Sequence, residues 1–103
     1  MAFNFIKMPH FTYILQSEKS GRFYIGATKE LDVRIWRHNK GSTPSTRSGR
    51  PWKLVYFEQF SSKIEALKRE REIKRMKSRL YIEALIMVQK SENDHIPGNS
   101  SSG

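Results

Sequence analysis

The fold is decided by residues 11–26, which read FTYILQSEKSGRFYIG. The first six of these residues alternate between the two faces of a strand, and RFYIG forms a second short strand. The polar SEKSG segment between them contains a glycine, as a hairpin connection does. A turn over residues 17–20 would pair Tyr13 with Tyr24, and directly opposed residues of an antiparallel pair project from the same face. We therefore expect a hairpin with both phenols side by side, in a register that a one-residue slip would destroy.

A helix is predicted directly after this hairpin. Thr28 can cap a helix that begins at Lys29 and ends near Gly41, because glycine is the favoured residue after a helix end. Arg34 and His38 are four residues apart in this helix, so their side chains point in the same direction.

The remaining elements are read in the same way. Residues 42–50 are rich in serine and threonine and indicate a loop, whereas residues 53–57 (KLVYF) are apolar on both faces and indicate a strand buried in a sheet. Ser62 to Glu65 form a capping box that begins a further helix, and Ser78 can cap a last one. The apolar sides of these two helices would be Ile64, Leu67, Ile73 and Met76, and Tyr81, Ala84, Leu85 and Val88.

These elements predict an α/β fold, a three-stranded antiparallel sheet flanked by about three helices. The folded domain would span residues 10–88, with residues 1–9 as a flexible lead-in and residues 89–103, which are mostly polar, as a disordered tail.

Charge is the most informative feature of the composition. Nineteen lysines and arginines oppose ten acidic residues, which gives the 103-residue chain a formal net charge of +9. This balance favours a polyanionic partner, nucleic acid before an anionic membrane, although a simply basic domain is the plain alternative. The chain has no cysteine, which excludes disulfides, cysteine nucleophiles and thiolate zinc sites. The lack of cysteine fits a reducing cytoplasm, nothing at the start reads as a signal peptide, and no apolar run reaches membrane-spanning length, so we expect a cytoplasmic protein without a membrane partner.

Several of these residues resemble the motifs of the GIY-YIG endonuclease family, in particular its small single-domain bacterial members. Tyr24-Ile25-Gly26 matches the second motif, and Arg34 and His38 follow it. The first motif is degenerate, since Phe11-Thr12-Tyr13 keeps only the tyrosine of Gly-Ile-Tyr. The Glu-x-x-Ile-Lys spacing selects Glu70, and not Glu72, as the family glutamate. The resemblance covers about residues 10–88.

The resemblance implies a catalytic set formed by Tyr13, Tyr24, Arg34, His38 and Glu70. Glu70 would also be the protein ligand of Mg²⁺ or Mn²⁺, because Mg²⁺ keeps several waters and one carboxylate is chemically sufficient. Arg34 would grip the non-bridging phosphate oxygens with two hydrogen bonds. Either tyrosine could act as general base or orient the attacking water, and His38 could relay a proton or contact phosphate. The alternatives are two packed aromatic rings, a surface histidine, a surface arginine and a solvated glutamate paired with Arg69 or Lys74.

Seven of the twelve residues from Lys68 to Arg79 are basic, and a run of this kind binds phosphates without regard to sequence. An ordinary solvated helix face with ion pairs four residues apart is the alternative. Trp52 is a candidate for stacking on an unpaired base. The predicted nucleic-acid-binding residues are Arg37, Arg47, Arg50, Lys68, Arg71, Lys74 and Arg75.

The sequence thus predicts an Mg²⁺-dependent endonuclease that acts on DNA, with branched or damaged DNA of the kind met in DNA repair as its substrate. No zinc finger or reading helix is evident, which favours a structure-selective enzyme or one directed by a protein partner over a sequence-specific one. Two alternatives stay open: a nucleic-acid-binding module with little activity alone, and an interaction protein that receives its substrate through another subunit. His10 and His95 are assigned no role.

Overall fold

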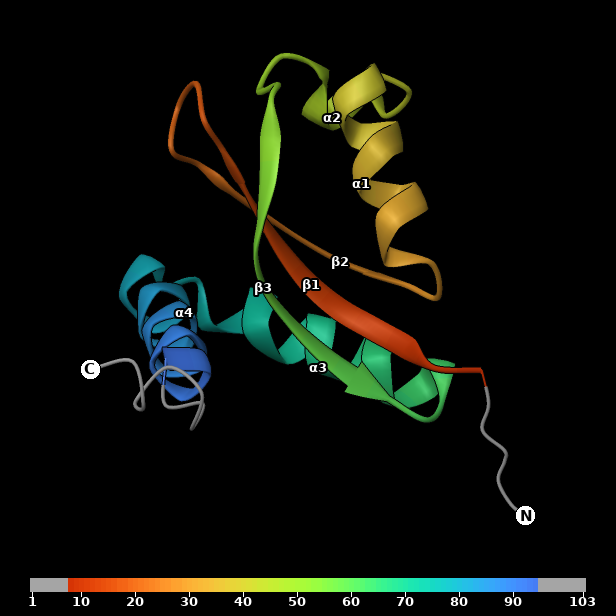
Figure 1. The fold of residues 1–103 in the computed structure, drawn as a ribbon, viewed down its shortest axis with the longest axis vertical. Helices are drawn as coiled ribbons and strands as arrows, with labels where there is room; N and C mark the ends of the chain where they lie inside the picture. Colours follow the sequence, from red (N-terminus) through yellow and green to blue (C-terminus); the bar gives the residue numbers. More distant parts are fainter. Residues whose placement is uncertain (1–7, 95–103) are drawn as a thin grey trace.

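The structure, a computed structural model, describes residues 8–94 and forms one sheet with helices on both sides (Figure 1). The strands are β1 (His10–Ser17), β2 (Phe23–Thr28) and β3 (Trp52–Phe60), and they pair antiparallel in the order β2-β1-β3. The helices are α1 (Leu31–Lys40), α2 (Pro44–Arg47), α3 (Lys63–Met76) and α4 (Arg79–Asp94). The predicted α/β class and three-stranded sheet are confirmed, and α2 is a single extra turn inside the predicted loop.

β1 is the central strand, and helices cover both of its faces. Tyr13, Ile14 and Leu15 are consecutive and all have 0% exposure, which requires burial on both sides of the sheet. The expectation that the KLVYF strand is the buried one is wrong, because β3 lies at the edge. Its apolar residues alternate between two helix-covered faces, so they need no further strand beyond them.

The hairpin register differs from the predicted one by two residues. Tyr13 pairs with Gly26, and Tyr24 pairs with Leu15. The turn is larger than expected because the Ser17 hydroxyl accepts hydrogen bonds from the Lys19 and Ser20 backbone N–H groups, at 3.1 and 2.9 Å. Since side chains alternate with a period of two, a two-residue shift leaves both tyrosines on the same face. The ring centroids of Tyr13 and Tyr24 lie 6.3 Å apart, so the prediction that the two phenols lie side by side is confirmed.

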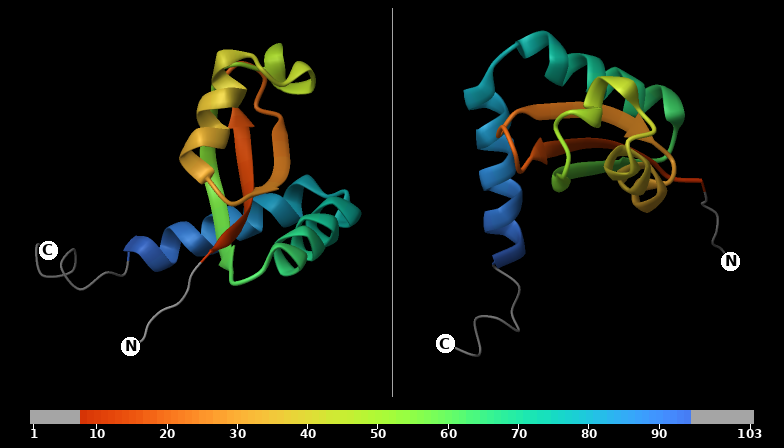
Figure 2. Two further views of the ribbon diagram at one scale, coloured as in Figure 1. Left: turned by 90° about the vertical axis from the view of Figure 1, so that its right-hand side faces the viewer. Right: turned by 90° about the horizontal axis from the view of Figure 1, so that it is seen from above.

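Two hydrophobic clusters lie on opposite faces of the sheet. On the α1 side, buried Tyr13, Leu15 and Trp52 pack with Tyr24, Leu31, Ile35 and Leu54. On the other side, buried Ile14, Tyr56, Ile73 and Ile82 pack with residues of β2, β3 and α4. Figure 2 shows α1 on one side of the sheet and α3 on the other.

The predicted helix ends are mostly confirmed. The Ser62 hydroxyl accepts a hydrogen bond from the Glu65 N–H at 3.2 Å, and the Ser78 hydroxyl does the same for the Tyr81 N–H at 3.0 Å. Gly41 follows α1 with φ of 88°, a left-handed conformation that glycine adopts without strain. The start of α1 is later than predicted: Thr28 accepts from the N–H of Glu30, and the helix begins one residue after that.

The predicted apolar sides of α3 and α4 are partly wrong. Ile64 and Met76 are 77% and 52% exposed, and the buried residues of α3 are Ala66 and Ile73. In α4 the buried position is Ile82, whereas Ala84 and Val88 are exposed. Only a narrow face of each helix contacts the sheet, so apolar residues on the neighbouring faces of the helix remain exposed to solvent.

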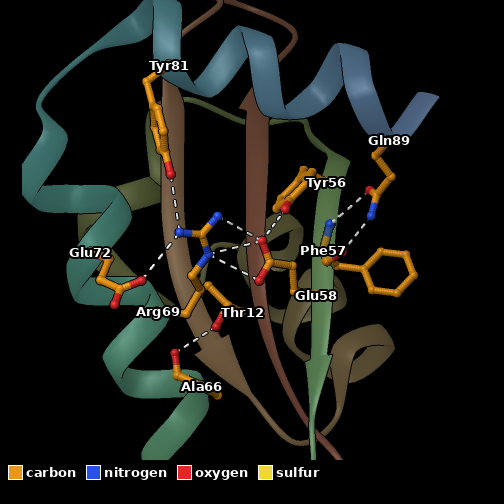
Figure 3. Close-up of polar contacts among 9 residues, drawn as sticks. All are labelled: Thr12, Tyr56, Phe57, Glu58, Ala66, Arg69, Glu72, Tyr81 and Gln89. Carbon is orange, nitrogen blue, oxygen red and sulfur yellow. Dashed lines mark hydrogen bonds and ion pairs between the residues drawn. The ribbon is translucent and has the colours of Figure 1, made fainter. Parts of the chain in front are cut away.

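α4 continues to Asp94 and covers the outer edge of β3. The Gln89 side-chain amide donates to the Phe57 carbonyl oxygen at 2.7 Å, and its oxygen accepts from the Phe57 N–H at 3.2 Å (Figure 3). An edge strand has unpaired backbone groups, and these two bonds satisfy one residue of it. Residues 89–94, expected in the disordered tail, are therefore helical, and residues 95–103 lie outside the described part of the chain.

Arg69 of α3 joins three elements on this side of the sheet (Figure 3). Its guanidinium lies 3.0 Å from the Glu58 carboxylate on β3, 3.4 Å from Glu72 and 3.2 Å from the Tyr81 hydroxyl on α4. The Glu58 carboxylate also accepts a hydrogen bond from Tyr56, and burial together with this bond raises the pKa of Tyr56 to about 12. One arginine of the basic run is therefore structural. Within residues 8–94, none of the helices combines the length and the apolar character needed to cross a bilayer.

Candidate active site

Tyr13 and Gly26 form the centre of the candidate site. The Tyr13 side chain extends from β1 across its pairing partner on β2, where a Cβ at residue 26 would lie 2.6 Å from the phenol oxygen. A Cβ carbon does not approach a non-bonded oxygen this closely, so only glycine leaves room for the ring. The last residue of the Tyr-Ile-Gly motif is therefore required by the first motif's tyrosine.

A buried chain of hydrogen bonds leads away from this phenol. The Tyr13 hydroxyl lies 3.1 Å from His38 Nε2, and His38 Nδ1 lies 2.9 Å from the Thr46 hydroxyl. Because Thr46 donates its hydrogen to the Thr43 carbonyl oxygen, its own oxygen accepts from His38 Nδ1–H. This assigns the neutral tautomer in which Nε2 is the acceptor for the Tyr13 hydroxyl.

The electrostatic surroundings keep both ends of this bond neutral. Burial, followed by the positive charge of Arg34, holds the pKa of His38 below its ordinary value. Burial and the proximity of Tyr24 raise the pKa of Tyr13 well above its ordinary value, while Arg34 acts in the opposite direction. Tyr13 and His38 are both 0% exposed, so in this conformation neither reaches solvent.

Tyr24 lies beside this pair with part of its surface open. Its ring centroid is 4.7 Å from that of His38 in an edge-to-face arrangement, and 6.3 Å from that of Trp52. Unlike Tyr13, it is half-buried. Of the two tyrosines, Tyr24 is the one that a solvent molecule can approach.

Arg34 connects the tyrosines to the surface. It projects from α1 one helical turn before His38, and its charge acts on both Tyr13 and His38. Its side chain also lines a surface hollow formed with the end of β2 and the start of α3. The guanidinium therefore lies between the buried cluster and solvent, where an incoming phosphate would meet it.

Glu70 comes from a different helix than Arg34 and His38. It belongs to α3, on the opposite side of the sheet from α1, and its carboxylate is 2.6 Å from Lys74 Nζ. α3 packs against β2 and β1, and the Glu70 charge is the smallest of the named influences on the pKa of Tyr13, which is raised mainly by burial. The structure thus gathers Tyr13, Tyr24, Arg34 and His38 into one cluster, and the Glu70 charge acts on the Tyr13 phenol of that cluster.

The donor set around Glu70 bears on the expected metal. Within the described residues no group of three or more histidine, cysteine or acidic side chains is arranged to hold a metal ion. Mg²⁺ does not need such a group, since it binds through one or two carboxylates with water and phosphate oxygens as the other ligands. Glu70 fits that chemistry, on condition that Lys74 releases the carboxylate.

The predicted nucleic-acid-binding residues fall into two classes. Three are engaged within the protein: Arg47 donates to the Gly41 carbonyl oxygen, Arg50 to that of Arg47, and Lys74 is paired with Glu70. All seven residues are exposed, so these internal contacts, and not burial, set the three apart from Arg37, Lys68, Arg71 and Arg75. Arg37 lies on α1 and the other three on α3, so the basic residues are spread over both sides of the sheet.

The aromatic prediction is corrected. Trp52 is only 3% exposed and its indole N–H donates to the Thr46 carbonyl oxygen at 2.7 Å, so it cannot stack on a base. Trp36 of α1 is 58% exposed, with Lys40 Nζ 4.4 Å from its ring centroid.

Thr46 is the site residue that sequence reasoning missed. It lies in the stretch expected to be a loop, and its hydroxyl orients His38 from the one-turn helix α2. A serine- and threonine-rich composition signals a turn but does not say which hydroxyl becomes buried. Its complete burial, at 0% exposure, follows only from the packing of α2 on α1 and β3.

Comparisons with known proteins bear on the whole of this arrangement. A family model described as the GIY-YIG catalytic domain matches residues 9–81. A UPF0213 protein of Staphylococcus saprophyticus is 47% identical over 66 residues, which cover 63% of this chain and 79% of that protein. A UPF0213 protein of Staphylococcus aureus is 44% identical over the same length, with the same coverage.

Among solved structures, the solution NMR structure of the UPF0213 protein BH0048 from Bacillus halodurans is 34% identical. It covers 91% of this chain and 94% of its own, with a TM-score of 0.47. The family match spans the three strands, the helices α1, α2 and α3, and the start of α4, including every residue of the predicted catalytic set. The chain belongs to the GIY-YIG family, whose catalytic domain is of the nuclease type.

Proposed function

We propose that this protein is a metal-dependent endonuclease that hydrolyses phosphodiester bonds in DNA, with its substrate chosen by DNA structure or by a protein partner. The observation that carries the proposal is the cluster of Tyr13, Tyr24, Arg34 and His38. A guanidinium beside two phenols and a neutral imidazole matches what phosphodiester hydrolysis needs: an anion binder and groups that orient water.

Arg34 binds the scissile phosphate in this scheme. Its planar guanidinium can donate two parallel hydrogen bonds to non-bridging oxygens, which a lysine reproduces poorly. It also stabilises the additional negative charge that develops on those oxygens when water attacks phosphorus. Removing such a donor costs on the order of 10²–10³ in rate.

Tyr24 orients the attacking water, because it is the accessible phenol. Its hydroxyl accepts a hydrogen bond from the water and aligns the oxygen with phosphorus. Tyr13 has a buried position and a raised pKa, which suit it poorly for taking a proton from solvent. Its role is to position the cluster: the chain Tyr13–His38–Thr46 fixes the ring against which Tyr24 packs.

Glu70 would hold Mg²⁺ or Mn²⁺ in place of Lys74. When bound, such an ion supplies polarisation of the phosphate and stabilisation of the departing 3′ oxygen. Glu70 reaches the cluster electrostatically, as its influence on the pKa of Tyr13 indicates, although burial is the larger cause of that shift.

A cleavage assay tests this function. Branched, single-stranded and duplex DNA are incubated with the full chain, with and without Mg²⁺, and compared with Arg34→Ala and Glu70→Gln. We expect metal-dependent cleavage of at least one structure, abolished by Glu70→Gln while DNA binding survives. Glu72→Gln, on the same helix two residues away, is the matched control and should cut as the wild type does.

A second candidate function is a nucleic-acid-binding module with little activity of its own. It is favoured by the ion pair between Glu70 and Lys74, which occupies the carboxylate that a metal ion would need. Binding that persists without metal, with no cleavage of any substrate, would support this module. Cleavage that appears only after addition of a cell fraction would point to a protein partner.

A further inference from the structure

A basic hollow lies beside the candidate site, between α1, the end of β2 and the first turns of α3. It has a volume of about 420 Å³, within the usual range of ligand sites. Its charged and titratable lining residues are His10, Lys29, Glu30, Arg34, Arg37 and Lys63. Of these only Arg34 and Arg37 were expected to meet nucleic acid from the sequence.

The charge of the lining selects an anion. Four side chains are permanently or ordinarily cationic, and Glu30 is the single carboxylate among the lining residues. Lys29, Glu30 and Arg37 are solvent-exposed at the rim, together with Lys63 at the first position of α3. Like charges gathered around a concave surface repel one another, and a phosphate inside the hollow would relieve that repulsion.

His10 adds a second, independent indication. Its Nδ1 is buried and has no hydrogen-bond partner within the described part of the chain. Most buried polar atoms in proteins have such a partner, and an orphaned one calls for an explanation. A phosphate oxygen bound in the hollow that His10 lines would supply the partner.

Arg34 connects this hollow to the candidate active site. Its side chain lines the hollow, and its charge also acts on Tyr13 and His38. A strand whose scissile phosphate is held by Arg34 therefore has a neighbouring phosphate at the entrance of the hollow. We propose that the hollow lined by His10, Lys29, Arg37 and Lys63 binds a second phosphate of the substrate strand, adjacent to the one that is cut. This inference rests on the proposed nuclease function and deepens it.

Binding measured without metal tests the proposal, because the proposed metal-dependent cleavage does not occur under these conditions. The affinity of the full chain for a short fluorescein-labelled single-stranded oligonucleotide is measured in EDTA over a range of salt concentrations. Each phosphate contact contributes about 0.7 to the slope of log K against log salt for single strands. We expect Lys63→Gln to reduce the slope by about 0.7, and Lys63→Arg to restore it.

Lys90→Gln is the matched control, since it removes the same charge from an exposed position of α4 outside the hollow. It should leave the slope unchanged. Oligonucleotides with and without a 5′ phosphate separate the two sources of the anion. A Lys63→Gln effect on both identifies an internal phosphodiester, whereas an effect on the phosphorylated oligonucleotide alone identifies a terminal phosphate, and either supports a phosphate site.

An NMR titration with inorganic phosphate gives a second readout. The ring signals of His10 should shift in the wild type and stay in place in Lys63→Gln. Equal slopes for Lys63→Gln and Lys90→Gln, with His10 signals that ignore phosphate, would overturn the proposal. If Lys63→Gln leaves the slope unchanged and the protein still shows metal-dependent cleavage, the phosphate site is excluded and the proposed nuclease function stands. If Lys63→Gln reduces the slope but the wild type cuts no DNA, the phosphate site stands and the proposed nuclease function is excluded.

Discussion

The phenol of Tyr13 occupies the space that any side chain at Gly26 would need. A Cβ on residue 26 would lie 2.6 Å from the Tyr13 hydroxyl oxygen and 2.7 Å from the ring carbon that bears it. Tyr13 is fully buried, so its ring has nowhere to move without disturbing the His38 hydrogen bond. The two Tyr-containing motifs are therefore one packing unit, although they lie on different strands.

Gly26→Ala should displace Tyr13 and lower both stability and activity. Overpacking a core by one carbon typically costs about 1–3 kcal/mol, and here the displaced ring also loses its bond to His38. Urea denaturation measures the stability. In the Tyr13→Leu background, where the ring is absent, the added cost of Gly26→Ala should shrink sharply; equal costs in both backgrounds would mean that the contact is not responsible.

The two tyrosines should respond differently to loss of their hydroxyl groups. Tyr24→Phe removes the accessible phenol and should reduce the cleavage rate on the order of 10²-fold or more, with little change in stability. Tyr13→Phe leaves the buried Nε2 of His38 without its partner and should destabilise the fold by about 1–3 kcal/mol. Single-turnover cleavage and chemical denaturation measure the two effects. The opposite pattern would make Tyr13 the phenol that meets the water.

The lowered pKa of His38 predicts a pH dependence of stability. Below about pH 6.5 an unfolded histidine binds a proton, whereas buried His38 beside Arg34 stays neutral until a lower pH. The unfolded state then binds more protons, so the His38 contribution is present above that pH and is lost as the pH falls toward the folded-state pKa. The unfolding free energy of the wild type should therefore fall more steeply between pH 7 and pH 5 than that of His38→Gln. Parallel curves would show that His38 does not titrate differently on folding.

Arg69 should behave as a structural residue, in contrast to its neighbour Arg71. The side chains of Arg69 and Glu58 are 21% and 25% exposed and 3.0 Å apart, so Arg69→Ala removes the ion pair of a mostly buried carboxylate and leaves it only the hydrogen bond from Tyr56. Discounted for its partial exposure, the loss should be about 1–3 kcal/mol. Arg71→Ala, on the exposed side of the same helix, should change stability by less than about 0.5 kcal/mol. Similar changes in melting temperature for Arg69→Ala and Arg71→Ala would show that Arg69 is an ordinary surface arginine.

What the sequence could predict depended on how local the cause was. Ser62 and Gly41 were identified because a cap or a stop acts within a few residues. The shared face of Tyr13 and Tyr24 was identified because alternation survives the two-residue register error. Thr46 and the burial of Trp52 were missed, since they depend on how α2 packs across segments distant in the sequence.

Gln89 belongs to a segment of the domain that was expected to be disordered because it is polar. The sequence becomes polar at this residue, yet its side-chain amide makes two hydrogen bonds to the backbone of Phe57 on the edge strand β3. A chain that ends at Val88 loses both bonds and the last six residues of α4, so its urea midpoint should be clearly lower than that of a chain that ends at Asp94. Gln89→Ala isolates the bonds and should cost about 0.5–1.5 kcal/mol for each, less the solvent that replaces them at this exposed edge. Gln89→Glu is the informative comparison, because a carboxylate can accept from the Phe57 N–H but cannot donate to its carbonyl oxygen. The stability of Gln89→Glu should fall between those of the wild type and Gln89→Ala. Equal urea midpoints for the chains that end at Val88 and at Asp94 would place the domain boundary at Val88.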